Sequence, residues 1–205
     1  MAPSPALVLA SASPRRRQLL ALLGIAHEVD PAGVEESPLP GEAPETFAGR
    51  AARDKAAAVA RRHPGRPVLA ADTVVTVDGA ILGKPRDTAE AAAMLRTLSG
   101  RSHLVHTAAA LALGGRTASL VDTAEVRFRE LDERTIRWYV ATGEPLDKAG
   151  AYAVQGAGGL LVARVHGSPH TVVGLPLHRL PELFAELGLD LLAHLGRGSD
   201  VSPRA

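Results

Sequence analysis

Residues 102–128 read SHLVHTAAALALGGRTASLVDTAEVRF, two long strand-like runs joined by a pair of glycines. The runs cover Ser102–Leu113 and Arg116–Phe128, and Gly114-Gly115 between them is a typical turn signal between consecutive strands. A regular doubly wound sheet separates its strands by helices throughout, so it has no place for such a pair. This stretch therefore predicts a mixed α/β sheet.

The segments on either side alternate irregularly between strand and helix patterns. Val68–Val77 is apolar and β-branched, and the Asp78-Gly79 that follows is a strong hairpin signal. Further strands are expected at 6–10, 26–30, 81–82 and 160–165, and helices are expected to begin at Pro14, Pro44, Asp87, Asp132 and Pro176. No internal repeat or domain linker interrupts this order, so we expect a single domain over residues 1–196 and a disordered tail over 197–205.

The composition excludes several classes of protein. The chain has 205 residues, of which 46% are hydrophobic, and a formal net charge of +1, which gives no overall attraction to nucleic acid or to an anionic membrane. It has no cysteine, which excludes disulfides, thiolate metal sites and a cysteine nucleophile. Residues 104–113 form the longest uncharged apolar stretch, well short of the roughly twenty residues that span a bilayer. We expect a cytoplasmic protein with no nucleic-acid or membrane partner.

The first candidate site lies at the start of the first expected helix. Ser13 is suited to cap this helix, whose unpaired N–H groups favour anions. The hydroxyls of Ser11 and Ser13 add donors, and Arg15 or Arg16 adds a fork that matches phosphate. The alternative is an ordinary capped helix with solvated arginines.

Two acidic positions are the next candidates. Asp72 interrupts an apolar strand, where a buried carboxylate needs a cation, a metal or several N–H donors, although it could instead cap a turn at the strand end. Glu35-Glu36 lies in a Pro-rich loop and is usually solvated surface; it holds a divalent cation only if other carboxylates lie nearby.

The lysines point to the same region. The chain has only three, Lys55, Lys84 and Lys148, against 20 arginines, so each lysine can mark a place that requires a compact ammonium. Lys84 lies near Asp72 if the strands around Asp78-Gly79 pair. The alternative interpretation is an ordinary lysine in a surface turn. The glycine-rich loop at 143–156 holds Lys148 and Gln155, whose amide can both donate and accept hydrogen bonds.

The eight histidines form no convincing metal spacing. His103 and His106 would face opposite sides of a strand, and we expect all eight to be ordinary surface or edge residues.

Six ordered stretches carry a specific resemblance. LASASPRR, ADTVV, GKPRD, LSGRSH, EPLDKAGAYAVQG and VVGLPL together resemble the Maf family of nucleoside triphosphate pyrophosphatases, over about residues 7–187. The DKAGAY…QG version resembles the subgroup that acts on dTTP and UTP. The resemblance implies hydrolysis of a nucleoside triphosphate to the monophosphate and diphosphate, a house-cleaning activity that protects nucleic acids. It also implies a twisted mixed sheet flanked by helices, with a nucleotide cleft between two closely packed lobes. The expected cofactor is a divalent cation (Mg²⁺ or Mn²⁺), and the resemblance is compatible with a homodimer.

The resemblance also assigns roles to residues. Asp72 falls on the proton acceptor of the family, and Arg15, Thr73 and Gln155 fall on positions of substrate selectivity. Other polar pocket positions of the family correspond to Ser11, Ser13, Arg16, Glu35, Lys55 and Lys84. Glu35 and Asp72 are the expected metal ligands.

Two other functions remain open. A nucleotidyltransferase also begins with an apolar strand, a small-residue loop and an arginine, but it normally has a glycine-rich loop, and Ala10-Ser11-Ala12-Ser13 has no glycine. A nucleotide-binding regulator of cell division or septum formation would use the nucleotide as a signal. Release of pyrophosphate without a second substrate separates both from a hydrolase.

Overall fold

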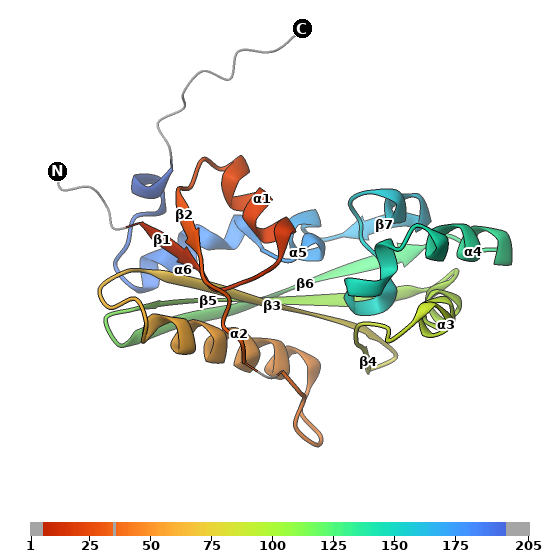
Figure 1. The fold of residues 1–205 in the computed structure, drawn as a ribbon, viewed down its shortest axis with the longest axis horizontal. Coiled ribbons are helices and arrows are strands. Elements are labelled where there is room, and N and C mark those ends of the chain that lie inside the picture. The colour runs from red at the N-terminus through yellow and green to blue at the C-terminus, as the bar shows by residue number, and fades with distance from the viewer. Residues whose placement is uncertain (1–5, 35, 196–205) are drawn as a thin grey trace, which may run out of the picture.

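The computed structural model describes residues 6–34 and 36–195 and contains a seven-stranded mixed sheet in the order β2-β1-β3-β5-β6-β7, with β4 paired to β3 (Figure 1). The strands are β1 (Leu7–Leu9), β2 (His27–Val29), β3 (Val68–Val77), β4 (Ala80–Leu82), β5 (Ser102–Leu113), β6 (Arg116–Phe128) and β7 (Val162–His166). β1 runs parallel to β2 and β3, and every other pairing is antiparallel. The mixed sheet and its central 102–128 hairpin are as predicted.

Helices cover both faces and one end of this sheet. They are α1 (Pro14–Leu22), α2 (Pro44–Ala60), α3 (Thr88–Leu98), α4 (Glu133–Ala141), α5 (Pro169–Val173) and α6 (Leu180–Glu186). As expected, Asp87 and Asp132 cap their helices, accepting bonds from the backbone N–H groups of Glu90 and Thr135. The short α5 was not predicted, and 3-10 turns replace regular structure over much of 144–161.

The edge of β3 is only partly covered by other strands. β5 pairs with it continuously from Val68 to Thr76. On the opposite edge, β1 pairs with Val68 and Leu69, and β4 pairs with Val75–Val77. Within the described chain, no strand pairs with residues 70–74 on that edge, so the sheet has a gap beside Asp72 and Thr73.

The two faces of β3 belong to different cores. Val68, Ala70 and Val74 pack with α2, while Leu69 and Ala71 pack with α1 and α6. Because side chains alternate along a strand, Asp72 points to the α2 face and Thr73 to the opposite face. Two adjacent polar residues therefore reach into two different environments beside the gap.

The long strands β3, β5 and β6 connect two ends of the molecule (Figure 1). One end holds β1, β2, α1 and α6, and the other holds α3, α4 and the 3-10 turns. This is the arrangement of two closely packed lobes that was expected. The terminal segment 197–205 and Glu35 lie outside the described residues. No helix in the described ranges is long and apolar enough to cross a membrane.

Candidate active site

A cavity of about 840 Å³ opens at the gap beside β3 and is lined from both ends of the molecule. The β1–α1 segment supplies Ser11, Ser13, Arg15 and Arg16 from one side. The opposite wall comes from the turn after β4 and from the 3-10 region. Clefts of several hundred Å³ are typical of sites that enclose small molecules of nucleotide size.

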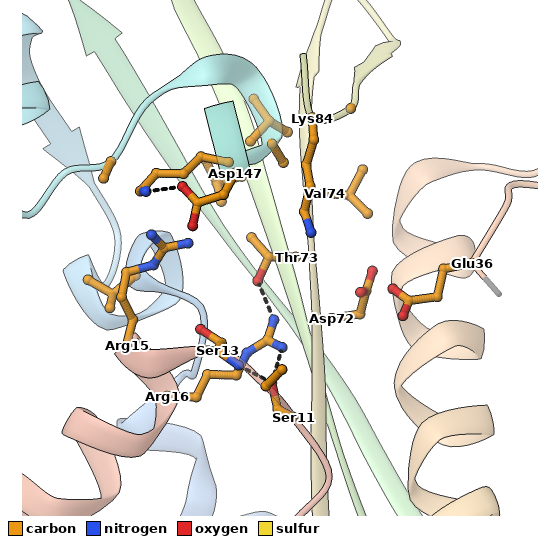
Figure 2. Close-up of a pocket in the computed structure, with 18 of the residues that line it drawn as sticks. Ser11, Ser13, Arg15, Arg16, Glu36, Asp72, Thr73, Val74, Lys84 and Asp147 are labelled. Carbon is orange, nitrogen blue, oxygen red and sulfur yellow. Dashed lines mark hydrogen bonds and ion pairs between the residues drawn. The ribbon is translucent and has the colours of Figure 1, made fainter. Parts of the chain in front are cut away.

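On the α2 face, one lysine holds two carboxylates. Lys55 Nζ lies 2.7 Å from Asp72 Oδ1 and 2.6 Å from Glu36 Oε2. Lys55 reaches this place because it belongs to the buried stripe of α2, together with Phe47 and Ala51. Figure 2 shows Glu36 and Asp72 directed toward each other, one from the segment that precedes α2 and one from β3.

The two carboxylates titrate differently. Burial opposes ionisation of Asp72, but the Lys55 ammonium, the hydrogen bond with Glu36 and the charge of Arg16 together outweigh it, so the pKa of the Asp72 carboxyl is lowered. Burial raises the pKa of Glu36, and the charge of Asp72 adds to this rise. When the pair binds one proton, Glu36 therefore holds it and Asp72 stays ionised.

On the other face, Arg16 is fixed by three hydrogen bonds. Its Nε donates to the Gly174 carbonyl at 2.8 Å, one terminal nitrogen donates to Ser11 Oγ at 2.9 Å, and the other donates to Thr73 Oγ1 at 3.1 Å. A guanidinium has five N–H groups, so two remain for a ligand. Burial lowers the pKa of Arg16, but a guanidinium stays charged in proteins.

The Thr73 hydroxyl is oriented by a buried neighbour. Thr107 Oγ1 donates its only proton to the Thr171 carbonyl at 2.7 Å. In the 3.0 Å contact between the two threonine hydroxyls, Thr73 must therefore be the donor and Thr107 the acceptor. The Thr73 oxygen can then only accept, as it does from Arg16.

Every described residue of the predicted site lines the same cavity. These are Ser11, Ser13, Arg15, Arg16, Lys55, Asp72, Thr73, Lys84 and Gln155. Pairing of β3 with β4 brings Lys84 to Asp72 as the hairpin predicted, and in Figure 2 its side chain extends toward Asp72 and Thr73. Ser13 occupies the cap position of α1, but its hydroxyl makes no capping bond and remains for a ligand.

Two further cavity residues were not among those given a catalytic, substrate-binding or metal-binding role. Glu36, next to the predicted Glu35, lies at the site, and Asp147 points toward Arg15 (Figure 2). The sequence marked the acidic pair and the glycine-rich loop but had no periodicity at either place to indicate which side chain faces inward.

The expectation for the histidines was wrong at two positions. His103 and His106 do lie on opposite faces of β5, but both are buried. His106 Nε2 contacts Thr76 Oγ1 at 3.1 Å, and His103 Nε2 contacts Tyr152 Oη at 2.8 Å. Each imidazole reaches the interior because a hydroxyl partner meets it there.

The family of the chain follows from comparison with known proteins. A family model described as "Maf-like protein" matches residues 6–187, from β1 to the end of α6. The chain belongs to the Maf family. This Maf chain is 56% identical over 185 residues to a protein of Myxococcus xanthus named dTTP/UTP pyrophosphatase. The aligned region covers 90% of this chain and 94% of that protein.

Other Maf relatives carry the same name. A protein of Anaeromyxobacter dehalogenans is 53% identical over 92% of this chain and 97% of its own length, and one of Shigella sonnei is 49% identical over 87% and 91%. A solved structure, the Ham1 protein of Staphylococcus aureus, aligns with 60% of this chain and 71% of its own at 17% identity and a TM-score of 0.44, too low to support a fold assignment.

Proposed function

We propose that this Maf protein hydrolyses dTTP, UTP or modified pyrimidine triphosphates to the monophosphate and diphosphate. The observation that carries the proposal is the gap beside β3, where Arg16 and Lys84 meet an ionised Asp72 in one cavity. The names of the similar proteins support the same substrates.

The positive groups suit a polyphosphate. A nucleoside triphosphate carries about four negative charges, which must be neutralised before water can attack the α-phosphorus. Arg16 is already fixed by its three protein bonds, so little side-chain entropy is lost when its remaining N–H groups bind phosphate. Arg15 and Lys84 supply further cations from opposite walls.

Asp72 is the proposed proton acceptor. Its lowered pKa keeps it ionised at neutral pH, and a carboxylate has about four acceptor positions, so the bond from Lys55 leaves room for a water molecule. A positioned general base contributes roughly 10²–10⁴-fold to a rate. Lys55 fixes the orientation of this carboxylate.

The donor set fits a hard divalent cation. The described residues hold no group of three or more metal-binding side chains, but Mg²⁺ commonly uses one or two carboxylates and takes its other ligands from water and substrate phosphates. Glu36 and Asp72 are the proposed ligands, and Glu35, which lies outside the described residues, stays a predicted ligand. A bound Mg²⁺ or Mn²⁺ would polarise the phosphoryl oxygens and offset the charge of the carboxylate pair.

Arg15, Thr73 and Gln155 are the proposed selectivity residues. Gln155 is exposed at the cavity wall, where its amide can pair with the donor and acceptor edge of a pyrimidine base. Thr73 offers only an acceptor, because its proton is committed to Thr107.

The test is a panel of canonical and modified nucleotides with Mg²⁺ or Mn²⁺ and no second substrate, in which monophosphate and pyrophosphate are both measured. Equal release of the two from dTTP or UTP supports the proposal. Turnover that requires a sugar phosphate would indicate a nucleotidyltransferase, and tight binding without turnover would indicate a regulator. The cytoplasmic location and the homodimer stay predictions.

A further inference from the structure

The segment from Gly143 to Leu161 forms one wall of the cavity without regular secondary structure. It consists of three short 3-10 turns, at Glu144–Asp147, Ala149–Ala151 and Ala157–Leu161. Lys148 and Gln155 reach the cavity from it. Such a wall needs internal contacts to hold a side chain in one place, because no helix or strand does so.

The Glu144 carboxylate provides these contacts. Its Oε1 accepts from Tyr139 Oη at 2.8 Å and from the Gly158 N–H at 3.1 Å, and its Oε2 accepts from the Ala157 N–H at 3.1 Å. The Tyr139 oxygen in turn accepts from the Ala153 N–H at 3.1 Å. Burial raises the pKa of Tyr139, so its hydroxyl keeps the proton that it donates to Glu144.

The packing around this carboxylate leaves no room for side chains. A Cβ added at Gly156 would lie 2.8 Å from Glu144 Oε2. A Cβ at Gly158 would lie 2.3 Å from the Ala153 carbonyl oxygen and 2.5 Å from Tyr139 Oη. The two glycines therefore let the backbone that follows Gln155 pack closely against Glu144 and Tyr139.

Glu144 also contacts Lys148, another residue that lines the cavity from this segment. Its backbone carbonyl accepts from Lys148 Nζ at 2.9 Å. One residue, itself only half-buried, thus holds the backbone that carries Gln155 and the ammonium of Lys148.

We propose that Glu144 is a positioning residue that sets nucleotide selectivity by holding Gln155 at the cavity. This inference rests on the proposed function, and it assigns to Glu144 no contact with the substrate. Tyr139 belongs to the same set of contacts. Its hydroxyl accepts from the N–H of Ala153, two residues before Gln155, and donates to the Glu144 carboxylate.

The test compares Glu144→Gln with Glu133→Gln in steady-state kinetics on UTP, dTTP, CTP and ATP. In Glu144→Gln an NH₂ group replaces one oxygen and faces a donor that this oxygen had accepted from. Glu133 is instead at the exposed start of α4, the helix that carries Tyr139, and pairs with Arg96. For Glu144→Gln we expect KM for UTP and dTTP to rise roughly 5- to 10-fold, the loss of about one hydrogen bond, with a smaller change in kcat. The preference for UTP over CTP and ATP in kcat/KM should fall by a similar factor, and Glu133→Gln should match the parent protein.

A second variant keeps the inference testable if Glu144→Gln folds poorly. Tyr139→Phe keeps the ring and removes the hydroxyl, and it should lower selectivity in the same direction. Unchanged KM and selectivity in a folded Glu144→Gln protein, or an equal loss of kcat on all four nucleotides with KM unchanged, would overturn the positioning role. A parent protein that releases no pyrophosphate from any nucleotide would instead refute the proposed function.

Discussion

Asp72 and Thr73 are neighbours in β3, yet they make their contacts on opposite faces of the sheet. Asp72 accepts from Lys55 at 2.7 Å on the α2 face, while Thr73 accepts from Arg16 at 3.1 Å on the other face. They can serve one cavity only because β1 and β4 leave residues 70–74 without a strand partner on that edge. A ligand that enters the gap meets an acid on one side and a fixed guanidinium on the other.

Loss of the Lys55 ammonium should destabilise the protein in a pH-dependent way. In Lys55→Met, Asp72 and Glu36 lose the ammonium that bonds to both of them. Breaking a buried ion pair costs about 3 kcal/mol at the lower end of the usual range, and the lower end applies because Glu36 is partly exposed. Without the ammonium, burial raises the pKa of Asp72 above its value in the unfolded chain. The Asp72 carboxylate of the variant therefore binds a proton on acidification, and the difference in unfolding free energy from the parent protein becomes smaller.

Urea unfolding of Lys55→Met and the parent protein at pH 8 and pH 5 measures this effect. The difference in unfolding free energy should be larger at pH 8, and adding Asp72→Asn to Lys55→Met should recover part of it. An equal difference at both pH values would argue against two carboxylates that depend on the Lys55 ammonium.

Removal of the Thr107 hydroxyl should weaken substrate binding from a distance. In Thr107→Val the Thr73 proton loses its acceptor and the Thr171 carbonyl loses its donor, so Thr73 no longer presents a fixed lone pair to Arg16. We expect KM for UTP to rise roughly 3- to 10-fold, since about one hydrogen bond is misdirected, and Thr107→Ser to restore it.

Thr76→Val is the matched control for Thr107→Val. Thr76 is also a buried threonine of the sheet, but its hydroxyl contacts His106, which does not line the cavity, whereas that of Thr107 contacts Thr73, which does. Both valine variants should lose a similar unfolding free energy, about 1–3 kcal/mol for unsatisfied partners. A rise in KM of the same size in Thr76→Val would show a general loss of stability instead of a specific effect.

His103 should make the fold sensitive to mild acid. Burial lowers the pKa of His103 from 6.5 to about 4, so below pH 6.5 the unfolded chain binds a proton that the folded chain does not. Stability is therefore full above pH 6.5 and falls as the pH drops toward 4, with a loss of about 2 kcal/mol at pH 5 from this residue.

Unfolding of His103→Gln at pH 7 and pH 5 checks the contribution. The variant should lose less unfolding free energy from pH 7 to pH 5 than the parent protein. Replacement of the exposed His166 should leave that loss as it is in the parent protein. Identical pH dependence in His103→Gln and the parent would contradict a neutral, buried imidazole.

The sequence predicted local structure better than tertiary placement. Both long strands and the caps at Asp87 and Asp132 follow from residue pattern alone, because turn and cap chemistry acts over a few residues. The burial of His103 was missed because it depends on Tyr152, 49 residues away. The inward direction of Glu36 depends on Lys55, in a helix that starts after the loop, and no periodicity in 31–43 indicates it.

Asp72→Asn tests the central claim most directly, with pyrophosphate release and nucleotide binding measured on the same preparation. The asparagine oxygen can still accept from Lys55, so we expect an intact fold and a nucleotide Kd within a few-fold of the parent value, since only the negative charge is lost. The kcat for UTP and dTTP should fall roughly 10²–10⁴-fold, the contribution of a general base. A kcat within a few-fold of the parent would contradict Asp72 as the proton acceptor.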